Sequence, residues 1–188
     1  MLDETMSSPD QPSDGSIPTV FASIAPSPAL REDEPYSRDE LLQEIFDGSC
    51  QRFATRCAVR LIGSDLENSR RTELNYAELR DRSLRFAWQL RDMGVARGDR
   101  VVICLSRSID QYMAILGTLW AGACYVPVDW TYPQARIDFI VADSGAVLVV
   151  TESERAADMA VRALAIDTSL GDLAAHEPRP IDRAQTSA

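Results

Sequence analysis

The chain has 188 residues, a length that suits one domain with a tail. Its formal net charge is −10 and it has no run of basic residues, so it lacks the positive surface that binding to a phosphate backbone requires, and nucleic acid is excluded as a partner. All 19 basic residues are arginine, which excludes any chemistry that depends on a lysine of this chain.

The first 36 residues are expected to form a disordered acidic tail. Ser, Pro and Asp dominate this stretch, its apolar residues are isolated, and it holds more than half of the acidic excess. Such a segment buries too little apolar surface to offset its conformational entropy. Order is predicted to begin at Ser37, because Ser37 and Glu40 have the spacing of a capping box. An apolar helical stripe follows them, formed by Leu41, Leu42, Ile45 and Phe46.

A short strand and a longer helix are predicted next. The strand is "CAVRLI" at residues 57–62, and the polar run at residues 63–72 predicts a turn that leads to Leu74. Asn75 and Glu78 again have capping-box spacing, and Gly94 stands where a left-handed helix cap is expected. Between these signals, one helix face carries the apolar residues Leu79, Phe86, Leu90 and Met93.

The rest of the chain alternates apolar strands with helices. "GDRVVICL" is a continuous apolar run of the kind that parallel sheets cover on both faces. A helix is predicted from Ser108 to Gly122, then the strand "CYVPV", a helix over residues 133–142, the strand "AVLVV" and a helix over about 153–164 that leads to "LAID". This alternation predicts an α/β domain over residues 37–167, with a partial parallel sheet flanked by helices. Residues 168–188 lose all periodicity and are expected to form a loose, irregular C-terminal tail.

The compartment is predicted from cysteine usage and apolar runs. No stretch approaches the roughly 18 apolar residues of a membrane span, and the N-terminus lacks the pattern of an export signal, so we expect a cytoplasmic protein with no membrane partner. The cysteines Cys50, Cys57, Cys104 and Cys124 form no CxxC pair, and we expect them to be reduced. Cys104 and Cys124 lie in apolar runs, where a free cysteine behaves as a small hydrophobe.

The motifs that hold phosphates are missing from the sequence. Neither GxGxxG nor GxxxxGK[ST] occurs, and the strand "VVICL" continues into "SRSID" without a glycine. Arg107 at the start of a helix is interpreted as a surface arginine rather than an anion ligand. His176 lies in the aperiodic "AAHEPRP", which offers no scaffold to orient a base or a metal ligand, so it is expected to be solvated.

Asp129 is the one candidate at the carboxyl end of a predicted strand, where α/β sheets place their sites. Trp130 and Tyr132 stand where they would wall a pocket beside it. Alternatively, Asp129 holds a turn through its own backbone, and Pro133 begins the next helix. We favour the turn, and we predict no catalytic, cofactor-binding or metal-binding residue.

Two motifs carry a resemblance to a known family. The form L(T/S)YxEL appears as Leu74–Leu79, with Asn75 in place of the usual hydroxyl residue. The form LKAGxAYVPLD appears as Leu119–Asp129, with Trp120 replacing lysine and Cys124 replacing a small alanine. Over roughly residues 40–151 the chain resembles the start of the amino-acid adenylation domains of nonribosomal peptide synthetases, enzymes of secondary metabolite biosynthesis. These domains belong to the superfamily of AMP-forming acyl and aminoacyl ligases.

The resemblance implies the first part of the large subdomain of an adenylate-forming enzyme. A complete relative would bind ATP, Mg²⁺ and an amino acid, form the aminoacyl adenylate and pass it to a carrier-protein thiol. In the family both motifs are architectural, and the phosphate loop with its lysine, the nucleotide contacts, the substrate pocket and the catalytic lysine come later. The resemblance therefore predicts a truncated adenylation domain, inactive alone, with no cofactor bound by this chain.

Two alternatives stay open. In the first, the chain is one half of a split adenylating enzyme, and a complementing adenylation fragment supplies the phosphate loop and the lysine. In the second, it is a non-enzymatic interaction module on the same scaffold, which binds a synthetase, a carrier protein or a small ligand. A dinucleotide-binding or flavodoxin-like protein ranks last, because the sequence has no phosphate-holding loop after a strand.

Overall fold

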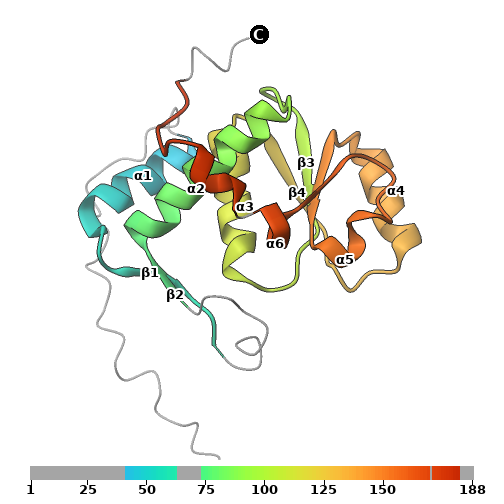
Figure 1. Ribbon diagram of the computed structural model, residues 1–188, viewed down its shortest axis with the longest axis horizontal. Helices are drawn as coiled ribbons and strands as arrows, with labels where there is room; N and C mark the ends of the chain where they lie inside the picture. Colours follow the sequence, from blue (N-terminus) through green and yellow to red (C-terminus); the bar gives the residue numbers. More distant parts are fainter. Residues whose placement is uncertain (1–40, 63–72, 170, 183–188) are drawn as a thin grey trace, which may run out of the picture. The chain divides into compact units, whose positions relative to one another are not determined.

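The computed structural model describes residues 41–62, 73–169 and 171–182 (Figure 1). Their elements, in chain order, are α1 (Leu42–Phe53), β1 (Cys57–Arg60), β2 (Glu73–Asn75), α2 (Tyr76–Asp92), β3 (Arg100–Ile103), α3 (Ile109–Trp120), β4 (Cys124–Pro127), α4 (Gln134–Ser144), β5 (Leu148–Thr151), α5 (Ser153–Ala156), β6 (Ala163–Ala165), α6 (Ile166–Ser169) and the 3₁₀ helix η3 (Asp172–Ala175).

The first described helix begins later than the sequence predicts. Ser37 and Glu40, the predicted capping pair, lie outside the described residues. Helix α1 follows Leu41, whose backbone N–H donates to the Glu44 carboxylate at 3.0 Å. The predicted strand is confirmed as β1, which pairs antiparallel with the unpredicted strand β2. The predicted turn at residues 63–72 also lies outside the described residues.

Helix α2 forms where the sequence predicts it, because its ends carry strong local signals. Asn75 accepts from the Glu78 backbone N–H at 2.8 Å, and the Asn75 N–H donates to the Glu78 carboxylate at 2.9 Å. The helix is followed by Gly94 with φ 87°. Its inner face packs closely on α3, since a Cβ added to Gly117 would lie 2.7 Å from Phe86 Cδ1 and 2.8 Å from the Ser83 carbonyl oxygen.

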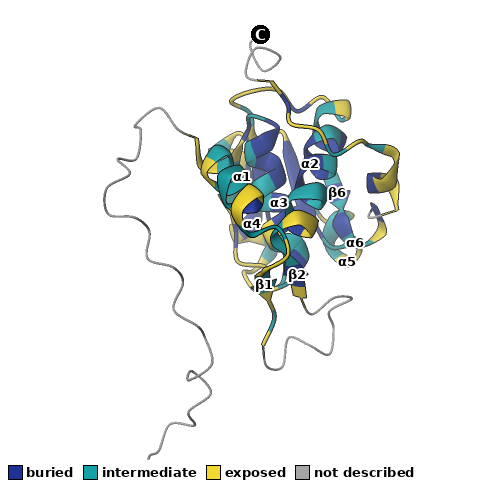
Figure 2. Cartoon of the chain, turned by 90° about the vertical axis from the view of Figure 1, so that its left-hand side faces the viewer, coloured by how far each residue is buried: buried dark blue, intermediate teal, exposed yellow. Residues whose placement is uncertain are grey.

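A parallel four-stranded sheet with the order β4-β3-β5-β6 forms the centre of the fold. Alternate residues along β3 and Cys104, which follows it, point to opposite faces: Val101 and Ile103 pack with α2 and α3, whereas Val102 and Cys104 pack with α4. Figure 1 shows α2 and α3 on one side of the sheet and α4 on the other. Buried residues concentrate on the strands and the inner helix faces (Figure 2). The predicted α/β class with a parallel sheet is confirmed.

Strand β4 is an edge of this sheet among the described residues. Cys124 N–H donates to the Asp99 carbonyl and Val128 N–H to the Ile103 carbonyl, so donors that face β3 occur at every second residue. Pro127 falls between them and faces away from β3. A proline at this position therefore costs no hydrogen bond to β3. It also removes one backbone N–H donor from the open edge of the sheet.

The predicted helix over about 153–164 is wrong. Only Ser153–Ala156 is helical, and Ala163–Ala165 is strand β6, which pairs parallel with β5. This stretch has an apolar stripe at helical spacing, formed by Ala157, Ala160, Val161 and Leu164, which is why the sequence predicts a helix. Pairing with β5 satisfies the backbone of residues 163–165, and this tertiary contact outweighs the high helix propensity of the local sequence.

The expectation of a loose C-terminal tail is also wrong for its described part. We call residues 171–182 the strap. Leu173 and Ile181 are buried in the same core as α2 and α3. Arg85 of α2 donates to the His176 carbonyl, and the Trp88 indole N–H donates to the Arg179 carbonyl at 2.9 Å. Residues 183–188 lie outside the described residues.

Candidate functional site

The strand order identifies the edge where a parallel sheet would hold a ligand. The chain leaves β3 for β4 on one side, and β5 lies on the other side of β3, with α3 and α4 on opposite faces. The topological switch point is where successive connections leave a strand in opposite directions. It therefore lies between the carboxyl ends of β3 and β5, the usual ligand position in open α/β sheets. We call the polar and aromatic residues that follow β3, β4 and β5 the carboxyl-edge cluster: Ser106, Arg107, Asp129, Trp130, Glu152 and Arg155.

Glu152 joins the two strand ends at the switch point. Ser106 donates to Glu152 Oε1 twice, through its backbone N–H at 3.3 Å and through its hydroxyl. The neighbouring Ser153 makes a similar pair, since its N–H and hydroxyl donate to the Asp167 carboxylate at 2.9 and 2.6 Å. The polar groups at the switch point thus satisfy one another and brace β3, β5 and the start of α6.

Asp129 forms the turn that the sequence favours. Its Oδ1 accepts from the Thr131 backbone N–H at 2.9 Å and from the Thr131 hydroxyl at 2.8 Å, which is an Asx turn. These two hydrogen bonds lower the pKa of Asp129 below its ordinary value, with a smaller contribution from the charge of Arg107. Pro133 directly precedes α4, as predicted. The carboxylate is exposed, and its acceptor capacity stabilises the turn.

The aromatic residues beside Asp129 lie on the surface. Trp130 is 40% exposed and Tyr132 is 41% exposed. The Arg155 guanidinium lies 5.7 Å from the centre of the Trp130 ring, so the two side chains stack on each other. Such a pair orders Arg155 at the surface beside the Asp129 turn.

The four cysteines are all free, as expected. Burial raises the pKa of the Cys104 thiol, and burial followed by the charge of Asp47 raises that of Cys50 to about 11. Both thiols are therefore protonated near neutral pH and are poor nucleophiles. Cys124, which the sequence places in an apolar run, is exposed, and it lies on β4, the edge strand of the described sheet.

His176 is more enclosed than the sequence predicts. Its side chain is 18% exposed, and its Nδ1 lies 3.6 Å from a carboxylate oxygen of Asp92 at the end of α2. Its carbonyl accepts from Arg85. The residue therefore belongs to the contact between the strap and α2, and neither of its polar groups points to a role in the carboxyl-edge cluster.

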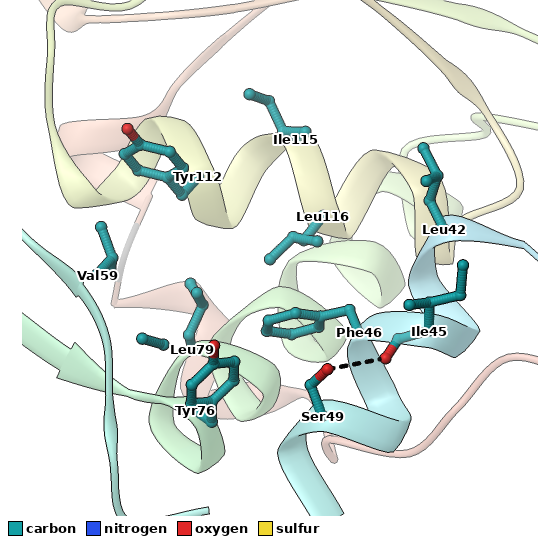
Figure 3. Close-up of a pocket in the computed structure, with 11 residues that line it drawn as sticks. Leu42, Ile45, Phe46, Ser49, Val59, Tyr76, Leu79, Tyr112, Ile115 and Leu116 are labelled. Carbon is teal, nitrogen blue, oxygen red and sulfur yellow. Dashed lines mark hydrogen bonds between the residues drawn. The ribbon is translucent and has the colours of Figure 1, made fainter. Parts of the chain in front are cut away.

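An open apolar groove lies between α1, β1, α2 and α3 (Figure 3). Its volume is about 510 Å³. Leu116 of α3 points toward Phe46 of α1, and Tyr112 of α3 lies nearer to Val59 of β1, as Figure 3 shows. The lining residues are Leu42, Ile45, Phe46, Ser49, Ala58, Val59, Tyr76, Leu79, Tyr112, Ile115 and Leu116. Three hydroxyls are the only polar side-chain groups in this lining, so the groove offers mainly van der Waals contact.

Sequence reasoning missed both the groove and the Ser106–Glu152 bridge. The groove has a partial signal in the apolar stripe of α1 and in the outward residues Tyr112 and Ile115 of α3. The bridge has none, because its partners are 46 positions apart. Among the described residues, no group of three or more His, Cys, Asp or Glu is placed to hold a metal ion. No helix in the same ranges is long and apolar enough to cross a membrane.

The parallel sheet with helices on both faces defines part of a doubly wound α/β domain. The turns at the carboxyl ends of its strands have a structural role. The model of the family described as AMP-binding enzyme matches residues 46–185. The chain therefore belongs to the AMP-binding enzyme family. The match includes the strap, which carries neither of the two motifs that the sequence reveals.

Similar curated proteins include synthases and synthetases. Syringomycin synthase SyrB1 of Pseudomonas syringae pv. syringae is 38% identical over 137 residues, which cover 72% of this chain and 21% of that protein. Malpibaldin synthetase of Mortierella alpina is 40% identical over 121 residues, 64% of this chain and 2% of that protein. The chain thus spans at most about a fifth of the length of these relatives.

Solved structures give the same result. A nonribosomal peptide synthetase, FmoA3, in its AMPPNP-bound form has a TM-score of 0.63 and 29% identity, over 76% of this chain and 14% of that one. The Klebsiella oxytoca NpsA N-terminal subdomain in complex with anthranilyl-AMSN has a TM-score of 0.59 and 26% identity, over 70% of this chain and 32% of that one. The chain is homologous to the adenylation domains of nonribosomal peptide synthetases, as the two motifs predict.

Proposed function

We propose that this chain is the first, architectural part of an amino-acid adenylation domain and does not form adenylates alone. The observation that carries the proposal is the use of both motifs in turns and caps. Asn75 and Glu78 cap α2, Gly122 takes φ 81° after α3, and Asp129 closes an Asx turn. Each polar group at these positions bonds to its own chain, which supports a scaffold role.

The carboxyl-edge cluster fits ATP poorly. A triphosphate needs backbone N–H groups and cations that point at its oxygens. Here Ser106, in the turn after β3, donates to Glu152. Ser108 caps α3 by accepting from the Gln111 N–H at 3.3 Å. The carboxylates of Glu152 and Asp129 would repel phosphate oxygens. These features support the proposal that ATP and Mg²⁺ are held by other parts of a complete adenylation domain.

Electrostatics gives a second reason to expect no catalysis by this chain. Stabilisation of the charge that develops on reacting phosphates is usually the largest catalytic term. The resemblance implies that the family supplies it from a phosphate loop and a lysine, and this sequence contains no lysine. Arg155, one of the cations at the carboxyl edge, stacks on Trp130 instead.

Amino-acid-dependent exchange of pyrophosphate into ATP tests the proposal. The purified chain is assayed with all twenty amino acids, beside a complete adenylation domain as a positive control and a no-enzyme blank. We expect no exchange above the blank while the chain keeps the far-UV circular dichroism of an α/β protein. Exchange with any amino acid would overturn the proposal.

A split enzyme is the second candidate. The chain covers 32% of the solved NpsA N-terminal subdomain, so further polypeptide would have to supply the rest of such a subdomain. In this arrangement a complementing adenylation fragment carries the phosphate loop and the lysine. Adding such a fragment, made from the remainder of a related domain, should restore exchange. No recovery despite stable association of the two chains argues against a split enzyme.

An interaction module is the third candidate, and the exposed apolar groove favours it. A synthetase or a carrier protein would bind this scaffold in the absence of ATP. Titration of labelled carrier protein with the chain separates this candidate from the first two. Saturable binding that ATP does not change supports it, whereas no binding removes the carrier protein as a partner.

A further inference from the structure

We draw no further inference here: the strongest candidate, the open apolar groove between α1, β1, α2 and α3 (Figure 3), is an unpartnered hydrophobic face, and nothing in the structure shows what covers it.

Discussion

Two regions pack on the same core by different means. The motif region, residues 108–133, is built from local contacts: Ser108 caps α3, Gly122 reverses the chain and Asp129 closes a turn. The strap, residues 171–182, has one short 3₁₀ helix and is held by long-range contacts with α2. The comparison teaches that a segment with little regular structure can be as much a part of a core as a capped helix. Our central claim is that both regions unfold as one cooperative unit.

The largest expected effect concerns the buried end of the strap. Ile181→Ala removes apolar atoms from the core and leaves a cavity, which should lower the free energy of unfolding by about 2 to 4 kcal/mol. Urea denaturation followed by circular dichroism measures this loss. The matched control is Ile62→Ala, which changes a side chain that is 81% exposed and should cost less than about 0.5 kcal/mol. Equal midpoints for the two variants would mean that the strap does not belong to the core.

The second prediction concerns the motif region at Gly122, where the chain reverses after α3. Gly122 has φ 81°, a conformation that a β-branched side chain rarely adopts, so Gly122→Val should lower the free energy of unfolding by roughly 1 to 3 kcal/mol. The control Gly48→Val places the same side chain in α1, where an added Cβ meets nothing within 4 Å. It should be neutral or slightly stabilising, because only helix propensity changes and valine is a better helix former than glycine. An unchanged urea midpoint for Gly122→Val would contradict the predicted strain.

The third prediction concerns the hydrogen bond between Trp88 of α2 and the strap. Trp88→Phe keeps an aromatic ring below Arg179 but removes the N–H that donates to the Arg179 carbonyl. We expect a loss of about 0.5 to 1.5 kcal/mol, the usual net value of one hydrogen bond. Trp130→Phe is the matched control, because that ring also stacks on an arginine. The prediction fails if both variants lose the same stability.

The smallest effect concerns Asp129, and it depends on pH. The folded-state pKa of Asp129 is lowered from its ordinary value of 3.8, mainly by the two hydrogen bonds from Thr131. The charged form therefore stabilises the turn above about pH 4, and this contribution is lost as the pH falls through the lowered pKa. Asp129→Asn keeps a side-chain oxygen for the turn and removes the charge.

We expect Asp129→Asn to shift the urea midpoint at pH 7 less than Ile181→Ala, Gly122→Val or Trp88→Phe, and the difference from the parent chain to shrink as the pH falls below 3.8. Urea melts of both proteins over this pH range measure the difference. A difference that grows as the pH falls would contradict the sign of the pKa shift.

The motif region was predictable from sequence because its signals are local. A cap such as Ser108, a glycine after a helix and an aspartate before Thr131 each act within three or four residues. The parallel sheet followed from the alternation of apolar runs with helices. The turn at Asp129 was predicted for the same reason, and it was favoured over the alternative interpretation of Asp129 as a site residue.

The rest depends on contacts between distant parts of the chain. Arg85 and Trp88 meet strap residues 91 positions away, and neither contact has a periodic signature. Leu173 and Ile181 are single buried anchors among polar residues, so no window of sequence marks them as core. Strand β6 has three residues, too few for a pattern, and its pairing with β5 decides its conformation. The Ser106–Glu152 bridge is hidden for the same reason.

The most direct test of the central claim uses two tryptophans as reporters of the two regions. Trp88 lies under the strap, with its indole N–H bonded to Arg179, and Trp120 is buried at the end of α3. The indole N–H signals of both are followed by NMR in chain labelled with ¹⁵N during urea denaturation. We predict that the two native signals disappear with the same midpoint, as one cooperative unit requires. Loss of the Trp88 signal at clearly lower urea than the Trp120 signal would show that the strap detaches first and would contradict the claim.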